Sequence, residues 1–193
     1  MGQIEAAIAG YLLGSLPFAY WFGLLQGKNL LLQGSGNLGA TNVLRSLGTF
    51  PALLVLLLDV LKGVFAVALG TFLAGGFTGG LLAGALAVWG HCFSVWVFGK
   101  GGKGIATAGG VLLAVSPLML LAGVVFWALG YLITRNPYRA VLVLTLLFPM
   151  LAAAIGRLGA YWWFGLGVGI PITLKHLADW DRPAWKVEPG KKD

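Results

Sequence analysis

Long stretches without a charged side chain dominate this sequence and limit what it can fold into. Asp, Glu, Lys and Arg are all absent from Gly63–Gly99 and again from Gly104–Thr134. Of the 193 residues, 59% are hydrophobic and 10% are charged, whereas roughly a quarter of an average soluble domain is charged. So few charged groups could not cover this much apolar surface in water. We therefore expect an all-α integral membrane protein, with one membrane domain over residues 1–193.

The apolar runs predict seven transmembrane helices, because one spanning helix needs about 20 apolar residues. Pro17 predicts a kink in the first span, and glycines at 75, 76, 79 and 80 predict a turn before the third. One helix over Gly104–Thr134 would measure about 46 Å, so we break it at Ser116-Pro117, which makes the fourth span short or broken. The predicted spans are about 4–25, 49–73, 81–98, 105–115, 117–133, 140–156 and 158–174, followed by a tail, 175–193.

The basic residues indicate how these spans are oriented. With seven spans, Arg157 lies alone on one face, and six spans would divide the charges far more evenly. Cytoplasmic segments carry an excess of Lys and Arg, so we expect the amino terminus outside and the basic face inside. That face carries Lys28, Arg45, Lys100, Lys103, Arg135, Arg139, Lys175, Arg182, Lys186, Lys191 and Lys192.

A glycine-rich segment on the predicted cytoplasmic face, residues 33–45, has the composition of an anion-binding loop. Gly34 and Gly36 allow successive backbone amides to point at one spot, and Ser35 adds a hydroxyl group there. The spacing of the glycines also matches a dinucleotide-binding fingerprint, but that motif requires a preceding strand. The segment therefore predicts a phosphate site without a nucleotide fold.

A helix that begins near Asn37 would strengthen this site through its N-terminal amides. Asn37, Thr41 and Arg45 would then share one helical face, and Arg45 could hold a phosphoryl group through two parallel hydrogen bonds. The alternative is a flexible loop with an ordinary basic residue. That alternative leaves the Ser, Thr and two Asn side chains, Asn42 included, unexplained.

A second glycine-rich segment, residues 90–107, lies on the same predicted face. Its glycine amides together with Lys100 and Lys103 predict a second oxyanion site, and the alternative is a basic turn beside the membrane. Asp59 is the only acidic residue between Glu5 and Asp179, so metal-clamped phosphoryl transfer has little support. Two phosphate sites on one face instead favour chemistry driven by positioning and oxyanion stabilisation.

These segments resemble the signature sequences of a known enzyme family. GSGNLGATNVLR at 34–45, Gly90-His91 with GKGGKGIAT at 99–107, and the Asp-x-x-Lys-Gly at 59–63 are similar to the bacterial glycerol-3-phosphate acyltransferases that use acyl phosphate, the PlsY family. The similarity runs through most of the chain. It departs at Asn136–Arg139 and at the tail, where the family usually has His-Arg-Glu-Asn and this chain has His176, Leu177, Ala178 and Asp179.

The resemblance implies an acyltransferase of the bacterial cytoplasmic (inner) membrane whose site faces the cytoplasm. It would move a fatty acyl group from acyl phosphate to the 1-hydroxyl of glycerol 3-phosphate, releasing 1-acylglycerol 3-phosphate and inorganic phosphate. Membrane lipid is its other partner; no metal, cofactor or nucleic acid is implied. The catalytic candidates are Ser35, Arg45, Lys103 and His176. The substrate-binding candidates are Gly34, Gly36, Asn37, Thr41, Asn42, His91, Lys100, Gly101, Gly102, Gly104 and Thr107.

Several roles stay open at this point. The sequence does not assign the two phosphates to the two loops, and the general base is His91, His176 or the phosphate of the substrate. Ser35 is either a binding group, which we favour, or a nucleophile. Asp59 and Lys62, three residues apart within a span, are expected to neutralise each other.

A phosphate or organic-anion transporter is the main alternative function. Charges inside the membrane and basic loops suit a carrier. Both anion loops lie on one predicted face, however, and the two halves of the chain show no inverted repeat of the kind found in many carriers. The sequence therefore favours the enzyme.

Overall fold

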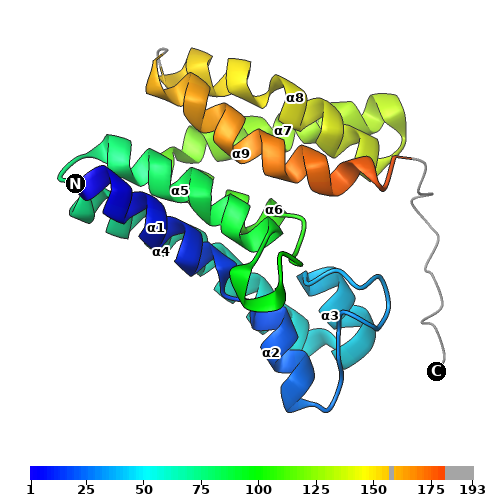
Figure 1. Cartoon of the computed structure of the whole chain (residues 1–193). Coiled ribbons are helices and arrows are strands. Elements are labelled where there is room, and N and C mark those ends of the chain that lie inside the picture. Colours follow the sequence, from blue (N-terminus) through cyan, green and yellow to red (C-terminus); the bar gives the residue numbers. More distant parts are fainter. Residues whose placement is uncertain (157–158, 181–193) are drawn as a thin grey trace.

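The computed structural model describes residues 1–156 and 159–180, and in this part of the chain all regular secondary structure is helical (Figure 1). The prediction of an all-α protein is confirmed. Predictions that concern Arg157 and residues 181–193, including Arg182, Lys186, Lys191 and Lys192, fall outside the described residues. The elements are α1 (Gly2–Ser15), α2 (Phe18–Leu25), α3 (Ala40–Leu47), α4 (Thr49–Leu73), α5 (Phe77–Cys92), a 3-10 turn (Val95–Val97), α6 (Ile105–Val115), α7 (Pro117–Thr134), α8 (Pro137–Gly156) and α9 (Ala160–Leu177).

Five helical segments in the described part are long and apolar enough to cross a membrane. They are Gly2–Leu25, Thr49–Leu73, Phe77–Val97, Pro117–Thr134 and Pro137–Gly156. α6 has 11 residues, so it measures about 16 Å against a hydrocarbon core of about 30 Å. Length and composition therefore do not by themselves give the seven spans expected from the sequence.

The first predicted span is broken rather than kinked. α1 ends at Ser15 and α2 begins at Phe18, with Leu16 in an extended conformation (φ −54°, ψ 114°). Pro17 has no N–H to donate and its ring disfavours a helical conformation at the preceding residue. The break leaves the carbonyl oxygen of Leu16 without a helical partner, and another side chain satisfies it.

The predicted glycine turn is shorter than expected, because α5 already begins at Phe77. Gly79 and Gly80 lie inside α5 and pack against α4. A Cβ atom on Gly79 would lie 2.5 Å from the carbonyl oxygen of Gly70, and one on Gly80 would lie 2.3 Å from Oγ1 of Thr71. These two glycines allow close helix packing and do not form the turn.

The boundary between α6 and α7 lies at Ser116, as the Ser-Pro pair indicates. The Ser116 hydroxyl accepts a hydrogen bond from the amide of Met119, and Pro117 occupies the first helical position. Both features stabilise a helix start.

Close contacts of small residues join the first helices into one group. A Cβ atom on Gly14 would lie 2.0 Å from the carbonyl oxygen of Ala87, so only glycine permits this approach of α1 to α5. α4 packs beside α1, α5 and α6, and α9 joins α5 to the pair of α7 and α8. Figure 1 shows α2 and α3 gathered at one end of the molecule, away from the amino terminus.

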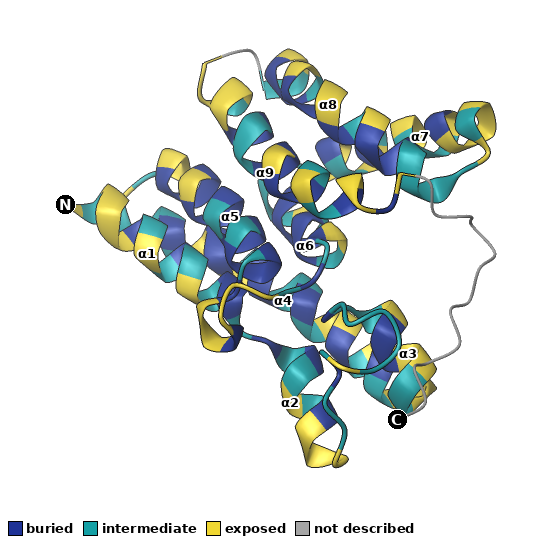
Figure 2. Ribbon diagram, turned by 45° about the vertical axis from the view of Figure 1, so that its right-hand side comes forward, coloured by how far each residue is buried: buried dark blue, intermediate teal, exposed yellow. Residues whose placement is uncertain are grey.

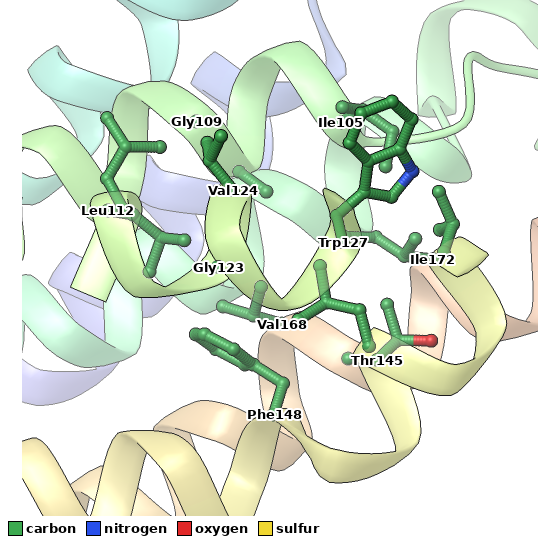
Figure 3. A pocket seen from close by; sticks show the side chains of 15 residues that line it. Ile105, Gly109, Leu112, Gly123, Val124, Trp127, Thr145, Phe148, Val168 and Ile172 are labelled. Atoms are coloured by element: carbon green, nitrogen blue, oxygen red, sulfur yellow. The ribbon is translucent and has the colours of Figure 1, made fainter. Parts of the chain in front are cut away.

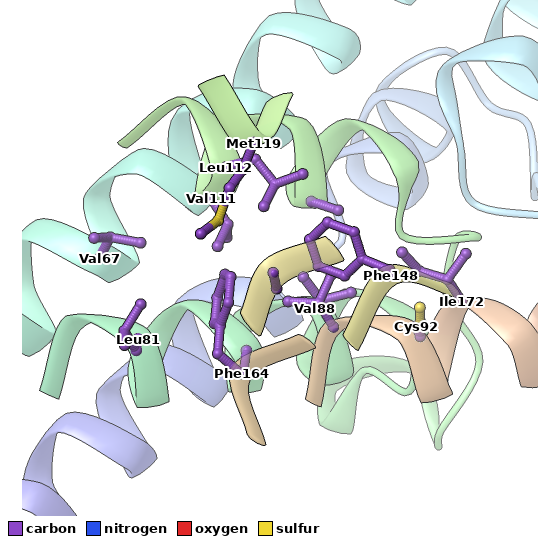
Figure 4. Packing of buried hydrophobic residues seen from close by; sticks show 14 of the residues in the cluster. Val67, Leu81, Val88, Cys92, Val111, Leu112, Met119, Phe148, Phe164 and Ile172 are labelled. Atoms are coloured by element: carbon purple, nitrogen blue, oxygen red, sulfur yellow. The ribbon is translucent and has the colours of Figure 1, made fainter. Parts of the chain in front are cut away.

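Two apolar clusters form the core. The larger one contains side chains from α4 to α9, among them Val88, Val111, Phe148 and Phe164 (Figure 4). The smaller one lies under the glycine-rich segments, where Leu38 of the first segment and Val97 of the second belong to the same cluster. Burial of shared apolar side chains therefore brings the two segments together.

Exposed residues occur along the outside of the helices (Figure 2), and many of them are large and apolar. Phe72 is 81% exposed, Trp163 is 72% exposed and Leu121 is 60% exposed. Such a surface is unfavourable in water and suits a lipid environment.

Candidate active site at the glycine-rich segments

Asn42 organises the first glycine-rich segment. Its side chain is buried, and Nδ2 donates hydrogen bonds to the carbonyl oxygens of Leu30 (3.2 Å) and Gln33 (3.1 Å). Oδ1 accepts a hydrogen bond from the amide of Ser35 (3.1 Å). Asn42, a substrate-binding candidate, thus holds the segment in shape through its amide group.

The amides expected to bind an anion are largely used inside this segment. The amide of Gly36 donates to the carbonyl oxygen of Gln33 (3.0 Å), and that of Asn37 donates to the Ser35 hydroxyl (3.4 Å). Gly34 and Gly36 do adopt the positive φ angles (58° and 67°) that the sequence suggested. The glycines therefore shape a compact turn, and the Ser35 hydroxyl keeps its proton available to a ligand.

The helix after this segment begins later than expected. α3 starts at Ala40 with Gly39 as its N-cap, so Asn37 precedes the helix and does not share a face with Thr41 and Arg45. The reason is that Asn37 and Leu38 are fixed in the segment by contacts with Ser35 and Gly101. Thr41 and Arg45 remain one turn apart on α3, and both are exposed.

The second segment is hydrogen-bonded to the first, and within it Gly102 is hydrogen-bonded back to His91. The amide of Leu38 donates to the carbonyl oxygen of Gly101 (3.4 Å), and the amide of Gly102 donates to the carbonyl oxygen of His91 (3.0 Å). A Cβ atom on Gly102 would lie 2.1 Å from Nε2 of His91 and 2.9 Å from the carbonyl oxygen of Leu38. Gly102 therefore fits tightly between the histidine ring and the first segment.

A buried charged cluster lies behind the second segment. Nζ of Lys62 is 2.8 Å from Oδ1 of Asp59, and Nδ1 of His91 is 3.5 Å from the same oxygen. Lys62 also donates to the carbonyl oxygen of Leu16 (3.0 Å), which the break between α1 and α2 left without a helical partner. The spacing of Asp59 and Lys62 indicated their pairing, but nothing in the sequence indicated His91 or Leu16 as their partners.

Lys103 contacts residues at the start of α8 and just after the end of α9. It forms an ion pair with Asp179, and its ammonium group lies 4.7 Å from the ring centroid of Tyr138. His176, in the last turn of α9, is buried, and its Nδ1 lies 2.8 Å from the carbonyl oxygen of Ile172. Neither Asp179 nor Tyr138 was among the site residues predicted from the sequence.

The other candidates of the second segment have different surroundings. Lys100 is exposed. Thr107 is fully buried, and its hydroxyl has no hydrogen-bond partner among the described residues. Gly104 has a φ of 86°, and a Cβ atom there would lie 2.9 Å from both Sγ of Cys92 and Cγ1 of Ile172.

An apolar cavity of about 380 Å³ begins next to Gly104, between α6, α7, α8 and α9 (Figure 3). Figure 3 shows Ile105, Trp127 and Ile172 at one end of it and Leu112 at the other. Ile105 directly follows Gly104 in the chain, and Ile172 lies beside Gly104. Both isoleucines line the cavity, so the second segment borders it. Its volume is in the range of small-molecule sites, and its lining is almost entirely apolar.

Comparison with known proteins finds a matching family and several similar sequences. A family model described as glycerol-3-phosphate acyltransferase matches residues 4–185. A glycerol-3-phosphate acyltransferase of Synechococcus sp. strain JA-3-3Ab is 44% identical over 191 residues, covering 98% of this chain and 93% of the relative. One from Agrobacterium fabrum strain C58 is 43% identical over 152 residues, covering 78% of this chain and 74% of the relative.

The fold is also similar to that of a solved structure. The crystal structure of PlsY (YgiH), an integral membrane glycerol 3-phosphate acyltransferase, in its glycerol 3-phosphate form superposes with a TM-score of 0.81. The two sequences are 32% identical, with 94% of this chain and 92% of that chain covered. These matches do not favour the transporter alternative. The chain belongs to the glycerol-3-phosphate acyltransferase family.

Proposed function

We propose that this chain transfers a fatty acyl group from acyl phosphate to the 1-hydroxyl of glycerol 3-phosphate. The products are 1-acylglycerol 3-phosphate and inorganic phosphate. The main support is the contact of the two glycine-rich segments at Leu38 and Gly101, beside a cavity that begins at Ile105 and Ile172. A polar site for two phosphates and an apolar site for a fatty chain would thus adjoin each other.

The membrane arrangement that we propose has seven spans, with α1 and α2 together forming the first and α6 a short fourth. The amino terminus lies at the turn between α4 and α5, because Gln3 donates a hydrogen bond to Thr78 (3.2 Å). α9 ends with Leu177 at the opposite end of the molecule. Asp179, two residues later, forms an ion pair with Lys103 there. Ends on opposite sides suit an odd number of crossings.

This orientation also follows the distribution of charge. The described basic residues at the end with the glycine-rich segments are Lys28, Arg45, Lys100, Lys103, Arg135, Arg139 and Lys175. An excess of Lys and Arg is typical of the cytoplasmic side. We therefore infer that the site faces the cytoplasm of a bacterial inner membrane, with the amino terminus outside.

In the reaction, the 1-hydroxyl oxygen attacks the acyl carbonyl carbon, and the bond from that carbon to the phosphate oxygen breaks. Phosphate leaves with the bonding electron pair, and the hydroxyl proton goes to a base. The phosphates and the developing oxyanion are stabilised by the positive charges of Lys103 and Arg45 and by the hydroxyl group of Ser35. Because phosphate is already a good leaving group, no covalent intermediate on Ser35 is needed.

His176 is our candidate for the base. A carbonyl oxygen only accepts hydrogen bonds, so Nδ1 of His176 must carry the proton in its contact with Ile172. The neutral ring then has its lone pair on Nε2, which can accept the proton of the attacking hydroxyl. His91 is less suitable, because Asp59 and Gly102 lie against its two nitrogens.

The acyl tail would lie in the apolar cavity with its carboxyl end at Ile105. Each methylene group that leaves water for such a site contributes about 0.8 kcal/mol. The lining contains Thr145, whose hydroxyl is 2.8 Å from that of Thr173, so even this polar group has a partner and does not oppose an apolar ligand.

The test uses purified protein in detergent with acyl phosphate and glycerol 3-phosphate. We expect release of inorganic phosphate and formation of 1-acylglycerol 3-phosphate only when both substrates are present. Replacing acyl phosphate by acyl-CoA should abolish the reaction, and His176→Ala should lower kcat far more than it changes KM. Phosphate release without acylated product, or no reaction from folded protein, would overturn the proposal.

A further inference from the structure

The ion pair between Lys103 and Asp179 joins a proposed phosphate-binding group to an acid far away in the sequence. The two residues are 76 positions apart, and their side chains are only 22% and 10% exposed. The ammonium group also lies over the ring of Tyr138. Lys103 therefore has a defined orientation. A carboxylate oxygen of Asp179 occupies a position next to its ammonium group that an oxygen of a bound phosphate could also occupy.

The position of Asp179 argues against a role in stabilising α9. Asp179 follows the C-terminal end of this helix, and its amide donates to the carbonyl oxygen of His176 (2.9 Å). The C-terminal end of a helix carries partial negative charge, so an acidic side chain is unfavourable there. The ion pair with Lys103 compensates for this unfavourable position. Asp179 also lies only three residues after His176, the proposed base.

We propose that Asp179 sets the affinity of the site for phosphate, because its carboxylate competes with phosphate for the ammonium group of Lys103. This inference rests on the proposed function. A phosphate oxygen and a carboxylate oxygen both accept charge-assisted hydrogen bonds from a lysine. A phosphate dianion that approaches Lys103 must displace Asp179 or share the lysine with it, and the two like charges then repel each other.

The consequence for the reaction lies in product release. Inorganic phosphate is a product, and a site that bound it too tightly would be slow to empty. When phosphate leaves, Asp179 takes up the ammonium group again, so Lys103 is never left partly buried without a counter-charge. Asp179 acts on the substrate through Lys103 and is a positioning residue rather than a catalytic one.

The experiment compares the wild type with Asp179→Asn, which keeps the size and removes the charge. Inorganic phosphate is titrated into purified protein in detergent and its binding is followed by ³¹P NMR; its Ki is measured in the transfer assay. We expect the variant to bind inorganic phosphate about fivefold more tightly, the size of effect expected when one partly exposed ion pair is lost. KM for the phosphorylated substrate held by Lys103 should fall in parallel.

A double-mutant cycle identifies Lys103 as the group through which Asp179 acts. In the background of Lys103→Met, Asp179→Asn should leave phosphate affinity unchanged, whereas a general effect of charge would persist. Glu5→Gln, which removes an exposed acid of α1, is the matched control and should have no effect. Asp179→Ser provides a second way to remove the charge.

The outcomes separate this inference from the proposed function. If the wild type transfers no acyl group, the proposed function fails. If transfer is intact but Asp179→Asn binds phosphate equally or more weakly, Asp179 does not compete and the inference is overturned. If neither Asp179 variant yields folded protein, as judged by melting temperature and gel filtration, Asp179 is required for folding. That result would also overturn the inference.

Discussion

The amide of Leu38 donates a hydrogen bond to the carbonyl oxygen of Gly101, 3.4 Å away, and so joins the two glycine-rich segments of the chain directly. Beneath this bond, Leu38 and Val97 share one apolar cluster. The two segments thereby stabilise each other. A site built across such a contact depends on residues that keep the two backbones close.

Gly102→Ala tests that dependence. The new methyl group would meet Nε2 of His91 at 2.1 Å and the carbonyl oxygen of Leu38 at 2.9 Å, so the segments must move apart. Because a displacement of about 1 Å can cost roughly 100-fold in rate, we expect a loss of that order in kcat/KM. Gly76→Ala is the control, since nothing lies within 4 Å of the position and its φ is −179°. Equal activity of the two variants would contradict the packed role of Gly102.

Asn42→Asp tests the scaffold of the first segment. The change keeps an acceptor for the amide of Ser35 but removes the donors to Leu30 and Gln33 and places a carboxylate beside their carbonyl oxygens. A buried group left without its partner costs about 1–3 kcal/mol. Hydrogen exchange of the amides of 33–37 should accelerate, with activity falling accordingly. Unchanged exchange would show that the segment holds its shape without Asn42.

Arg45→Lys tests the bidentate hold on a phosphate that we assign to this exposed side chain. Lysine keeps the charge but not the two parallel donors. We expect kcat/KM to fall roughly 10- to 100-fold, the effect of losing one charge-assisted hydrogen bond. Arg135→Lys is the matched control, because Arg135 is also an exposed arginine at a helix end. Similar losses in both variants would indicate a general effect of surface charge.

Asp59→Asn is expected to destabilise the protein, because it leaves Lys62 buried beside an uncharged partner. Breaking a buried ion pair from one side costs about 3–5 kcal/mol. Replacing both residues, as in Asp59→Asn with Lys62→Gln, should recover a large part of that loss. Unfolding in detergent followed by circular dichroism measures both values. A double variant that is no more stable than the single one would argue against direct coupling of the two charges.

Gly123→Leu is expected to shorten the apolar cavity. Gly123 lines it from α7, and nothing lies within 4 Å of a Cβ atom at this position. A leucine side chain would exclude about two methylene groups of a bound chain, which favours shorter donors by roughly tenfold. Relative kcat/KM values for acyl phosphates of two lengths give this ratio. Leu121→Phe, on the exposed side of the same helix, should not change the preference.

Local sequence signals predicted much of the helical pattern. Apolar runs located α4, α7 and α8, because an uninterrupted series of apolar residues suits a helix in lipid wherever it lies in the chain. The Ser116-Pro117 pair gave the start of α7 for a similarly local reason. The predictions for Pro17 and Gly79 were wrong: the helix breaks before Pro17 instead of kinking, and Gly79 packs against α4 instead of forming a turn. Both outcomes depend on residues that are close in space but not in sequence.

The glycine-rich segments themselves were evident from their composition, since repeated Gly, Ser and Asn beside apolar runs have few structural explanations. What the polar groups in them do was decided by tertiary structure. Asn42 holds its own segment, His91 lies against Asp59, and Lys103 pairs with Asp179. Hydrogen bonds and ion pairs require groups within about 3–4 Å, and chain separations of 32 and 76 residues become such distances only when helices pack.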